Sequence, residues 1–172
     1  MLRKLEKKDA KWMLEWMHDE EIQQNFRTDM LSRDYADALS FIENAAEKPE
    51  EGKNIHYAIV DEKDEYLGTI SLKKIDLTAG KAEYAICLRK KAQGKGIARQ
   101  ATKELLKKAF EEFGLERVYL NVLSDNEKAI HLYEKSGFCC EGEFRRHLFL
   151  NGRYKDLKWY GILKEEYEMM QK

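Results

Sequence analysis

The chain has 172 residues, 43% of them hydrophobic, which is enough for one domain with a core that needs neither a metal nor disulfide bonds. Its 31 lysines and arginines nearly balance 32 acidic residues, and a net charge of −1 provides no overall basic field for nucleic acid. The longest apolar run, Tyr84 to Leu88, is too short to span a membrane, and no apolar leader follows Met1. We therefore expect a cytoplasmic protein with neither nucleic-acid nor membrane partners.

The first third of the sequence predicts helices after one candidate strand. A typical N-cap, Asp9, precedes apolar residues that share one helical face, and two further helical stretches follow. The expected elements are a strand over Leu2–Leu5, a helix that places Trp12, Met13, Trp16 and Met17 on one face, and helices over Glu20–Phe26 and Arg33–Ala46.

The rest of the sequence predicts strands that alternate with two helices. Stretches rich in β-forming residues are separated by polar turns, and Asn151-Gly152 is a strong signal for a two-residue hairpin turn. We expect an antiparallel meander, then a helix, a strand, a helix and a hairpin, which together make a mixed α/β (α+β) domain over residues 1–172. The strands are Ile55–Val60, Tyr66–Lys73, Lys81–Leu88, Arg117–Val122, Phe138–Leu150 and Tyr154–Leu163; one helix runs from Ile97 to Phe113 and ends at Gly114, and the other is capped by Ser124, Asp125 or Asn126 and runs to Lys135.

The segment Gln93-Gly94-Lys95-Gly96-Ile97-Ala98 lies between a predicted strand and the long helix. Two glycines let the backbone come close to an anion, and the helix adds the positive end of its dipole. The local chemistry is that of a phosphate or pyrophosphate cradle. The sequence lacks the Walker pattern, and Arg99 stands where a dinucleotide fingerprint needs its third glycine.

A third pattern for such a loop, [Q/R]-x-x-G-x-[G/A], is satisfied by Gln93, Gly96 and Ala98. Farther along, Asn126–Phe138 fits N-x-x-A-x-x-x-Y-x-x-x-G-F. Both resemble signatures of the Gcn5-related N-acetyltransferase (GNAT) superfamily. The hairpin region from Glu141 to Asp156 is similar to the RimJ/RimL branch and to bacterial spermidine N-acetyltransferases.

The resemblance implies one GNAT domain, with a mostly antiparallel sheet of about seven strands whose central pair is splayed and flanked by helices. It implies acetyl-CoA as cosubstrate and no metal. Backbone groups of Ile86 and Leu88 would bind the pantetheine arm, Asn126 would contact the arm or its phosphate end, and Arg99 and Lys103 either reach the 3′-phosphate or form a solvated helix face. The pyrophosphate would lie on the loop, at Gln93, Gly94, Lys95, Gly96, Ile97, Ala98 and Arg99.

For catalysis, the resemblance assigns Tyr133 as the acid that protonates the leaving thiolate. Glu83, with a pKa raised by partial burial, is the candidate base, directly or through a water held by Asn121. His131 and His147 are alternative bases. No spacing of His, Cys and carboxylate residues indicates a metal site, and the three cysteines are expected to be free thiols.

The predicted function is acetyl transfer to a primary amine by direct attack in a ternary complex. The acceptor is a small molecule, such as a polyamine or an amino sugar, or a protein N-terminus. Glu20 and Glu21 would attract a polyamine, whereas a phosphorylated or nucleotide-linked amino sugar would be attracted by Arg27, Arg145 and Arg146. The alternatives are a catalytically silent acyl-CoA sensor and a nucleotide-binding module. A homodimer through an exposed strand edge is also expected.

Overall fold

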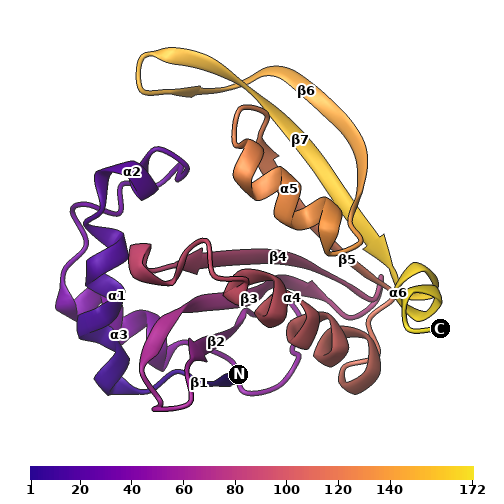
Figure 1. Ribbon diagram of the computed structural model, residues 1–172, viewed down its shortest axis with the longest axis horizontal. Coiled ribbons are helices and arrows are strands. Elements are labelled where there is room, and N and C mark those ends of the chain that lie inside the picture. The colour runs from indigo at the N-terminus through magenta and orange to yellow at the C-terminus, as the bar shows by residue number, and fades with distance from the viewer.

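The computed structural model describes residues 1–172, and its seven strands form one sheet in the order β1-β2-β3-β4-β5-β7-β6 (Figure 1). The strands are β1 (Leu2–Lys4), β2 (Ile55–Val60), β3 (Tyr66–Asp76), β4 (Lys81–Leu88), β5 (Arg117–Leu123), β6 (Cys139–Leu150) and β7 (Arg153–Leu163). The helices are α1 (Ala10–Met17), α2 (Glu20–Gln23), α3 (Tyr35–Glu43), α4 (Ile97–Lys107), α5 (Glu127–Lys135) and α6 (Lys164–Met170). None of the helices has the length and apolar character needed to cross a membrane.

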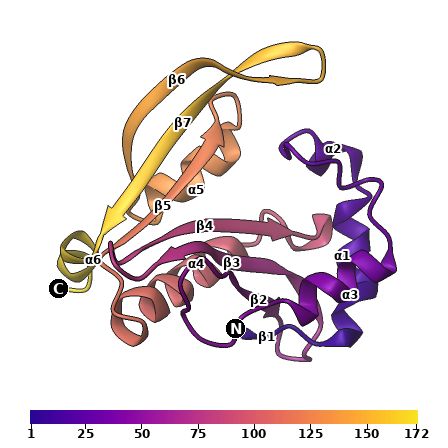
Figure 2. The ribbon, with the colours of Figure 1, turned by 180° about the vertical axis from the view of Figure 1, so that it is seen from behind.

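The sheet divides into two halves at the junction of β4 and β5. Every other neighbouring pair is antiparallel, whereas β4 and β5 are parallel and share only three paired positions, from Lys81↔Arg117 to Glu83↔Tyr119. Beyond Glu83 the two strands separate, and β5, β7 and β6 lean away from the other four strands (Figure 2). The predicted mixed sheet with a splayed central pair is therefore confirmed.

Helices cover the two faces of the sheet unequally. The larger core lies between the sheet and α4 and α5, where Leu105, Phe110 and Tyr133 pack on the inward residues of β3, β4 and β5. A smaller core lies on the other face, where α1 and α3 pack on Ala58 and Tyr66. Residues of β2 contribute to both cores, because successive residues of a strand point to opposite faces of the sheet. In Figures 1 and 2 no helix covers the back of the β5-β7-β6 half.

Three N-terminal expectations were wrong in detail. Asp9 does not cap α1 with its side chain, because it accepts bonds from the Arg3 guanidinium (2.7 and 2.9 Å) and the Glu6 amide instead. The helix expected over Glu20–Phe26 ends at Gln23, whose side chain bonds the loop backbone at Thr28 and Met30. The third helix is shorter than expected, since Asp34 caps it and it stops at Glu43.

The later elements follow the prediction more closely, with three differences, one of which is that β3 continues past its expected end at Lys73 to Asp76. The long helix passes into a π-helical turn (Lys108–Glu112) before it ends at Gly114, whose φ is +65°. A C-terminal helix, α6, was not predicted. The Asn151-Gly152 turn is confirmed, because both residues have the positive φ values, 51° and 76°, that a type I′ turn requires.

Candidate active site

The glycine loop joins a short 3-10 turn (Lys90–Ala92) to α4. Gly94 and Gly96 have φ values of +73° and +77°, a region that residues with a Cβ avoid, and the space beside each is open. Gly96 is also the N-cap of α4 and has no side chain that could bond the first amides of the helix. These N–H groups and the helix dipole are thus directed to solvent, and they suit a bound pyrophosphate.

Side chains on both sides fix the loop. Gln93 donates to the Leu88 carbonyl (3.3 Å) and accepts from Lys128 on α5 (2.7 Å), so it ties the loop to β4 and to α5. Ile97 and Ala98 are half-buried against the large core, whereas Lys95 and Arg99 are exposed. Sequence reasoning did not identify Lys128, because nothing in its motif distinguishes it from a solvated helix lysine.

The open edge of β4 is next to this loop. The Arg89 amide donates to the Leu67 carbonyl (2.9 Å), which sets the phase of the antiparallel β3–β4 ladder. The backbone groups of Cys87 and Ala85 therefore face β3, and those of Ile86 and Leu88 face the side that β5 has left. This orientation is the one that the predicted strand-like contact with a pantetheine arm requires.

Tyr133 lies on α5, between this edge and the large core. It is 9% exposed and packs edge-on against Tyr84 and Phe138, at ring distances of 5.7 and 6.0 Å. Burial, and the nearby Cys87, raise the pKa of the Tyr133 phenol well above its usual value. Its hydroxyl has no hydrogen-bond partner within the chain, and it keeps its proton at neutral pH.

Glu83 is buried on β4 and is bound by two lysines. Lys73 Nζ lies 3.0 Å from one carboxylate oxygen, and Lys74 Nζ lies 2.6 Å from the other. Burial alone would raise the pKa of Glu83, but the bond from Lys74 and the charge of Lys73 outweigh it, so this pKa lies below its ordinary value. The expected raised pKa was wrong, because the sequence did not reveal that both lysines reach this carboxylate.

The loop after α2 reaches across the splay and contacts two of the predicted site residues. Arg27 donates to the Asn121 side chain on β5 (2.8 Å), and Asn126 donates to Asn25 (3.2 Å). Asn126 also caps α5, since its side chain accepts from the Ala129 amide (3.2 Å). Asn25 was not predicted at the site, because only the fold brings it there.

The alternative bases are less well placed. His131 and His147 are both exposed, and neither shares a hydrogen bond with the residues at the splay. No group of three or more His, Cys, Asp or Glu side chains is arranged to hold a metal ion.

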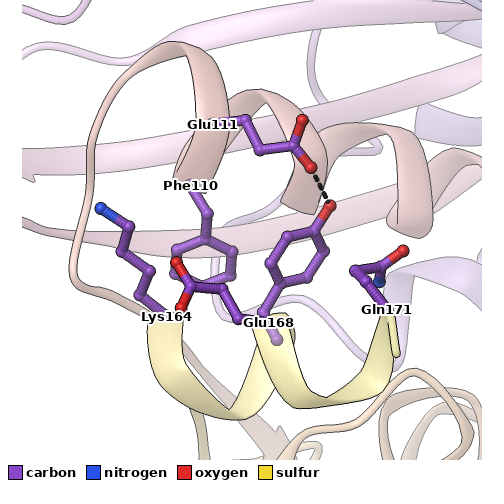
Figure 3. Close-up of a pocket in the computed structure, with 6 residues that line it drawn as sticks. Phe110, Glu111, Lys164, Glu168 and Gln171 are labelled. Atoms are coloured by element: carbon purple, nitrogen blue, oxygen red, sulfur yellow. Dashed lines mark hydrogen bonds between the residues drawn. The ribbon is translucent and has the colours of Figure 1, made fainter.

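One cavity lies far from this arrangement, and a second borders it through Asn25. The first, of about 380 Å³, is enclosed by the π-helical turn and α6, where the Tyr167 hydroxyl donates to Glu111 (Figure 3). It is at the opposite end of α4 from the glycine loop. The other, of about 530 Å³, lies between α2 and the tip of the β6–β7 hairpin and includes Glu20 and Arg153. Neither is lined by Tyr133 or Glu83.

Known proteins are similar to this chain in sequence and in fold. A family model described as an acetyltransferase (GNAT) domain matches residues 1–139. The chain belongs to the GNAT acetyltransferase family. The family predicted from the sequence, including its RimJ/RimL-like branch, is thereby confirmed.

Curated relatives and solved structures agree with this assignment. This GNAT chain is 36% identical over 121 residues to a spermidine N(1)-acetyltransferase of Vibrio cholerae. The aligned segment covers 67% of this chain and 70% of the relative. It is 41% identical over 101 residues to a putative ribosomal N-acetyltransferase of Bacillus subtilis, covering 59% and 55%. A crystal structure of the Vibrio cholerae spermidine N-acetyltransferase with CoA and spermine superposes with a TM-score of 0.86 at 28% identity, covering 98% of this chain and 97% of the other.

These findings establish the activity at the level of the family. The GNAT chain is an acetyl-CoA-dependent N-acetyltransferase, and its exposed glycine loop and open β4 edge fit that cosubstrate. The roles of Tyr133, Glu83 and Asn121, and the expected homodimer, stay predictions.

Proposed function

We propose that this GNAT chain moves the acetyl group of acetyl-CoA to a primary amine by direct attack in a ternary complex. The observation that carries the proposal is the separation of β4 from β5 beyond Glu83, between the glycine loop and Tyr133. A pantetheine arm in this opening would bring the thioester to Tyr133 from the α4–α5 side. The amine would then approach from the uncovered back of the sheet.

The residues at the opening suit the bonds that form and break. The amine nitrogen bonds to the thioester carbonyl carbon, the carbon–sulfur bond breaks, and the sulfur leaves as a thiolate. Tyr133 is protonated at neutral pH and its hydroxyl has no partner within the chain, so we assign it as the group that gives a proton to this sulfur. A backbone N–H on the open edge of β4, at Ile86 or Leu88, would stabilise the carbonyl oxygen as charge develops on it.

The amine must lose a proton, and Glu83 is the nearest carboxylate to the point where the strands part. Because two lysines lower its pKa, Glu83 is ionised at neutral pH but weakly basic. It therefore acts best through a water molecule, which Asn121 on the adjacent strand would help to hold. The relatives' names supply two acceptor classes for this chain, spermidine and a ribosomal acceptor.

Thermal unfolding with acetyl-CoA tests the cosubstrate site directly. Acetyl-CoA at about 100 times its Kd should stabilise the fold by about 2.7 kcal/mol, which raises the Tm by roughly 5–10 °C. Gly96→Glu should abolish the shift, because its side chain and charge enter the space where the pyrophosphate would lie. Gly114→Glu is the matched control, since Gly114 has the same left-handed backbone and open surroundings at the far end of the helix.

Release of CoA in the presence of amines tests the transfer itself. If the Gly96→Glu variant keeps the rise in Tm with acetyl-CoA, the assignment of the loop to the pyrophosphate is wrong. A normal shift without CoA release for any primary amine would contradict the transfer and leave an acyl-CoA sensor.

A further inference from the structure

A β-bulge places two consecutive lysines on the same side of β3. Neighbouring residues of a strand normally point to opposite faces. The β3–β4 register breaks between Lys73 and Asp76, and Lys74 has a φ of +50°, a conformation that non-glycine residues rarely adopt. The Asn54 side chain accepts a bond from the Lys74 amide (2.9 Å) and holds this backbone. As a result both ammonium groups reach Glu83.

A third cation joins this pair from the other side of the splay. Arg27, on the loop after α2, is exposed and is anchored by its bond to Asn121. Arg27 and Tyr119 are both close enough to Lys74 to affect its pKa electrostatically. Tyr119 is the residue of β5 that pairs with Glu83, so the three cations surround the place where the strands part.

The charges here do not cancel. Glu83 is the acidic partner of Lys73 and Lys74, and Arg27 forms no ion pair. Glu141, on β6, is held at 2.5 Å by both terminal nitrogens of Arg117. Lys73, Lys74, Arg27 and Glu83 together carry an excess of two positive charges, and the Lys74 side chain is 71% exposed to any ligand that enters.

We infer that the acceptor is a primary amine that also carries an anionic group, a phosphate or a carboxylate, which Lys74 and Arg27 bind. This inference rests on the proposed function and narrows its acceptor. A polyamine has only cations to offer, which these side chains would repel. An anion on the acceptor would instead draw Lys74 away from Glu83, and Glu83 would be left with one lysine and a greater basicity next to the reacting amine.

The test compares acceptors that differ only in the group distant from the amine. The distant group is a neutral hydroxyl in aminopropanol, a carboxylate in aminobutyrate, a phosphate in aminopropyl phosphate and a second cationic amine in diaminobutane. Initial rates of CoA release are measured by chromatography, because the exposed Cys139 and Cys140 would react with thiol reagents. We expect kcat/KM for one anionic amine to exceed that of aminopropanol by about tenfold or more, and diaminobutane to be the poorest.

Variants then assign the preference to the two cations. Lys74→Gln and Arg27→Gln should each lower the ratio of kcat/KM for the anionic amine to kcat/KM for aminopropanol by about tenfold, because this ratio cancels any effect on Glu83 or Asn121 that both amines share. Lys74→Arg, which keeps the charge, should restore the preference. Lys63→Gln is the control, because Lys63 lies in the β2–β3 turn and its ammonium forms no ion pair.

The outcomes separate this inference from the function on which it rests. Rates that are highest for diaminobutane, or a preference for anions that survives both variants, would overturn the inference and leave acetyl transfer standing. No CoA release with any of the four amines, although acetyl-CoA stabilises the fold, would overturn both. Whether the phosphate or the carboxylate is preferred identifies the anion.

Discussion

Tyr133 and Glu83 show how burial acts differently on two ionisable side chains of one site. The Tyr133 hydroxyl has no hydrogen-bond partner within the chain, so the effect of burial is left uncompensated and the phenol keeps its proton. Glu83 is as deeply buried, at 7% against 9% exposure, but two lysines reverse the effect. Their contacts therefore decide that Tyr133 keeps its proton and that Glu83 is an anion, although the sequence indicates burial for both.

We expect Tyr133→Phe to lower kcat by one to three powers of ten and to change acetyl-CoA affinity little, because only the proton donated to the sulfur is lost. Steady-state rates and acetyl-CoA titration measure the two effects. Tyr167→Phe removes the hydroxyl of another buried tyrosine, far from the site, and should leave kcat unchanged. Equal turnover in Tyr133→Phe and the parent chain would remove Tyr133 as the acid.

At the scale of elements, β2 and β3 hold a histidine whose protonation opposes folding. His56 is 8% exposed, its Nδ1 lies 2.7 Å from the Ser71 hydroxyl, and its ring packs on Phe41. Burial, and then the charge of Lys73, lower its pKa from 6.5 to about 4. The unfolded chain therefore binds a proton near pH 6.5, while the folded chain does not until about pH 4.

The contribution of His56 to stability is thus complete above pH 6.5 and is lost as the pH falls toward 4. We expect the free energy of unfolding in urea to drop by about 2 kcal/mol between pH 7.5 and pH 5 from this residue. In His56→Gln the drop should be smaller by that amount, whatever the variant's stability at pH 7.5. The same pH dependence in both proteins would show that His56 is not the cause.

The sequence predicts elements well where local signals are strong and poorly where a distant contact decides. The glycines around α4, the cap at Asn126 and the Asn151-Gly152 turn are local, and the structure has them where expected. The end of α2 depends on Gln23 folding the next loop back on itself, and the extension of β3 depends on Asn54 holding the bulge. The lysine pair on Glu83 was missed for that reason, since strand alternation predicts opposite faces for Lys73 and Lys74.

At the scale of the molecule, α6 closes the end of the chain against the far end of α4. Tyr167 is 4% exposed, packs on Phe110 with the two rings tilted and their centres 5.1 Å apart, and donates a hydrogen bond to Glu111. The helix was not predicted because its seven residues include only one deeply buried side chain and it follows β7 without a turn. Its stability comes from packing on the π-helical turn, which no local pattern reveals.

We expect Tyr167→Ala to destabilise the fold by about 3 kcal/mol, since it removes a buried ring and leaves a cavity. The Tm should fall by roughly 6–12 °C in a thermal scan, and acetyl-CoA should still stabilise the variant. Met169→Ala, at a side chain that is 62% exposed, should change the Tm by at most about 2 °C. If the two variants lose the same small amount, α6 does not support the core.

The three-residue contact between β4 and β5 also bears on how the chain reaches its fold. Strands β1 to β4 pair only among themselves apart from the short β4–β5 contact, and β5 to β7 do the same, although partners such as Leu2↔Ile59 and Arg117↔Leu163 are far apart in sequence. Only the crossover through α4 must join the two parts, and it does so at the place where the cosubstrate would lie. The residues that join the two halves during folding are therefore the same few that border the open seam.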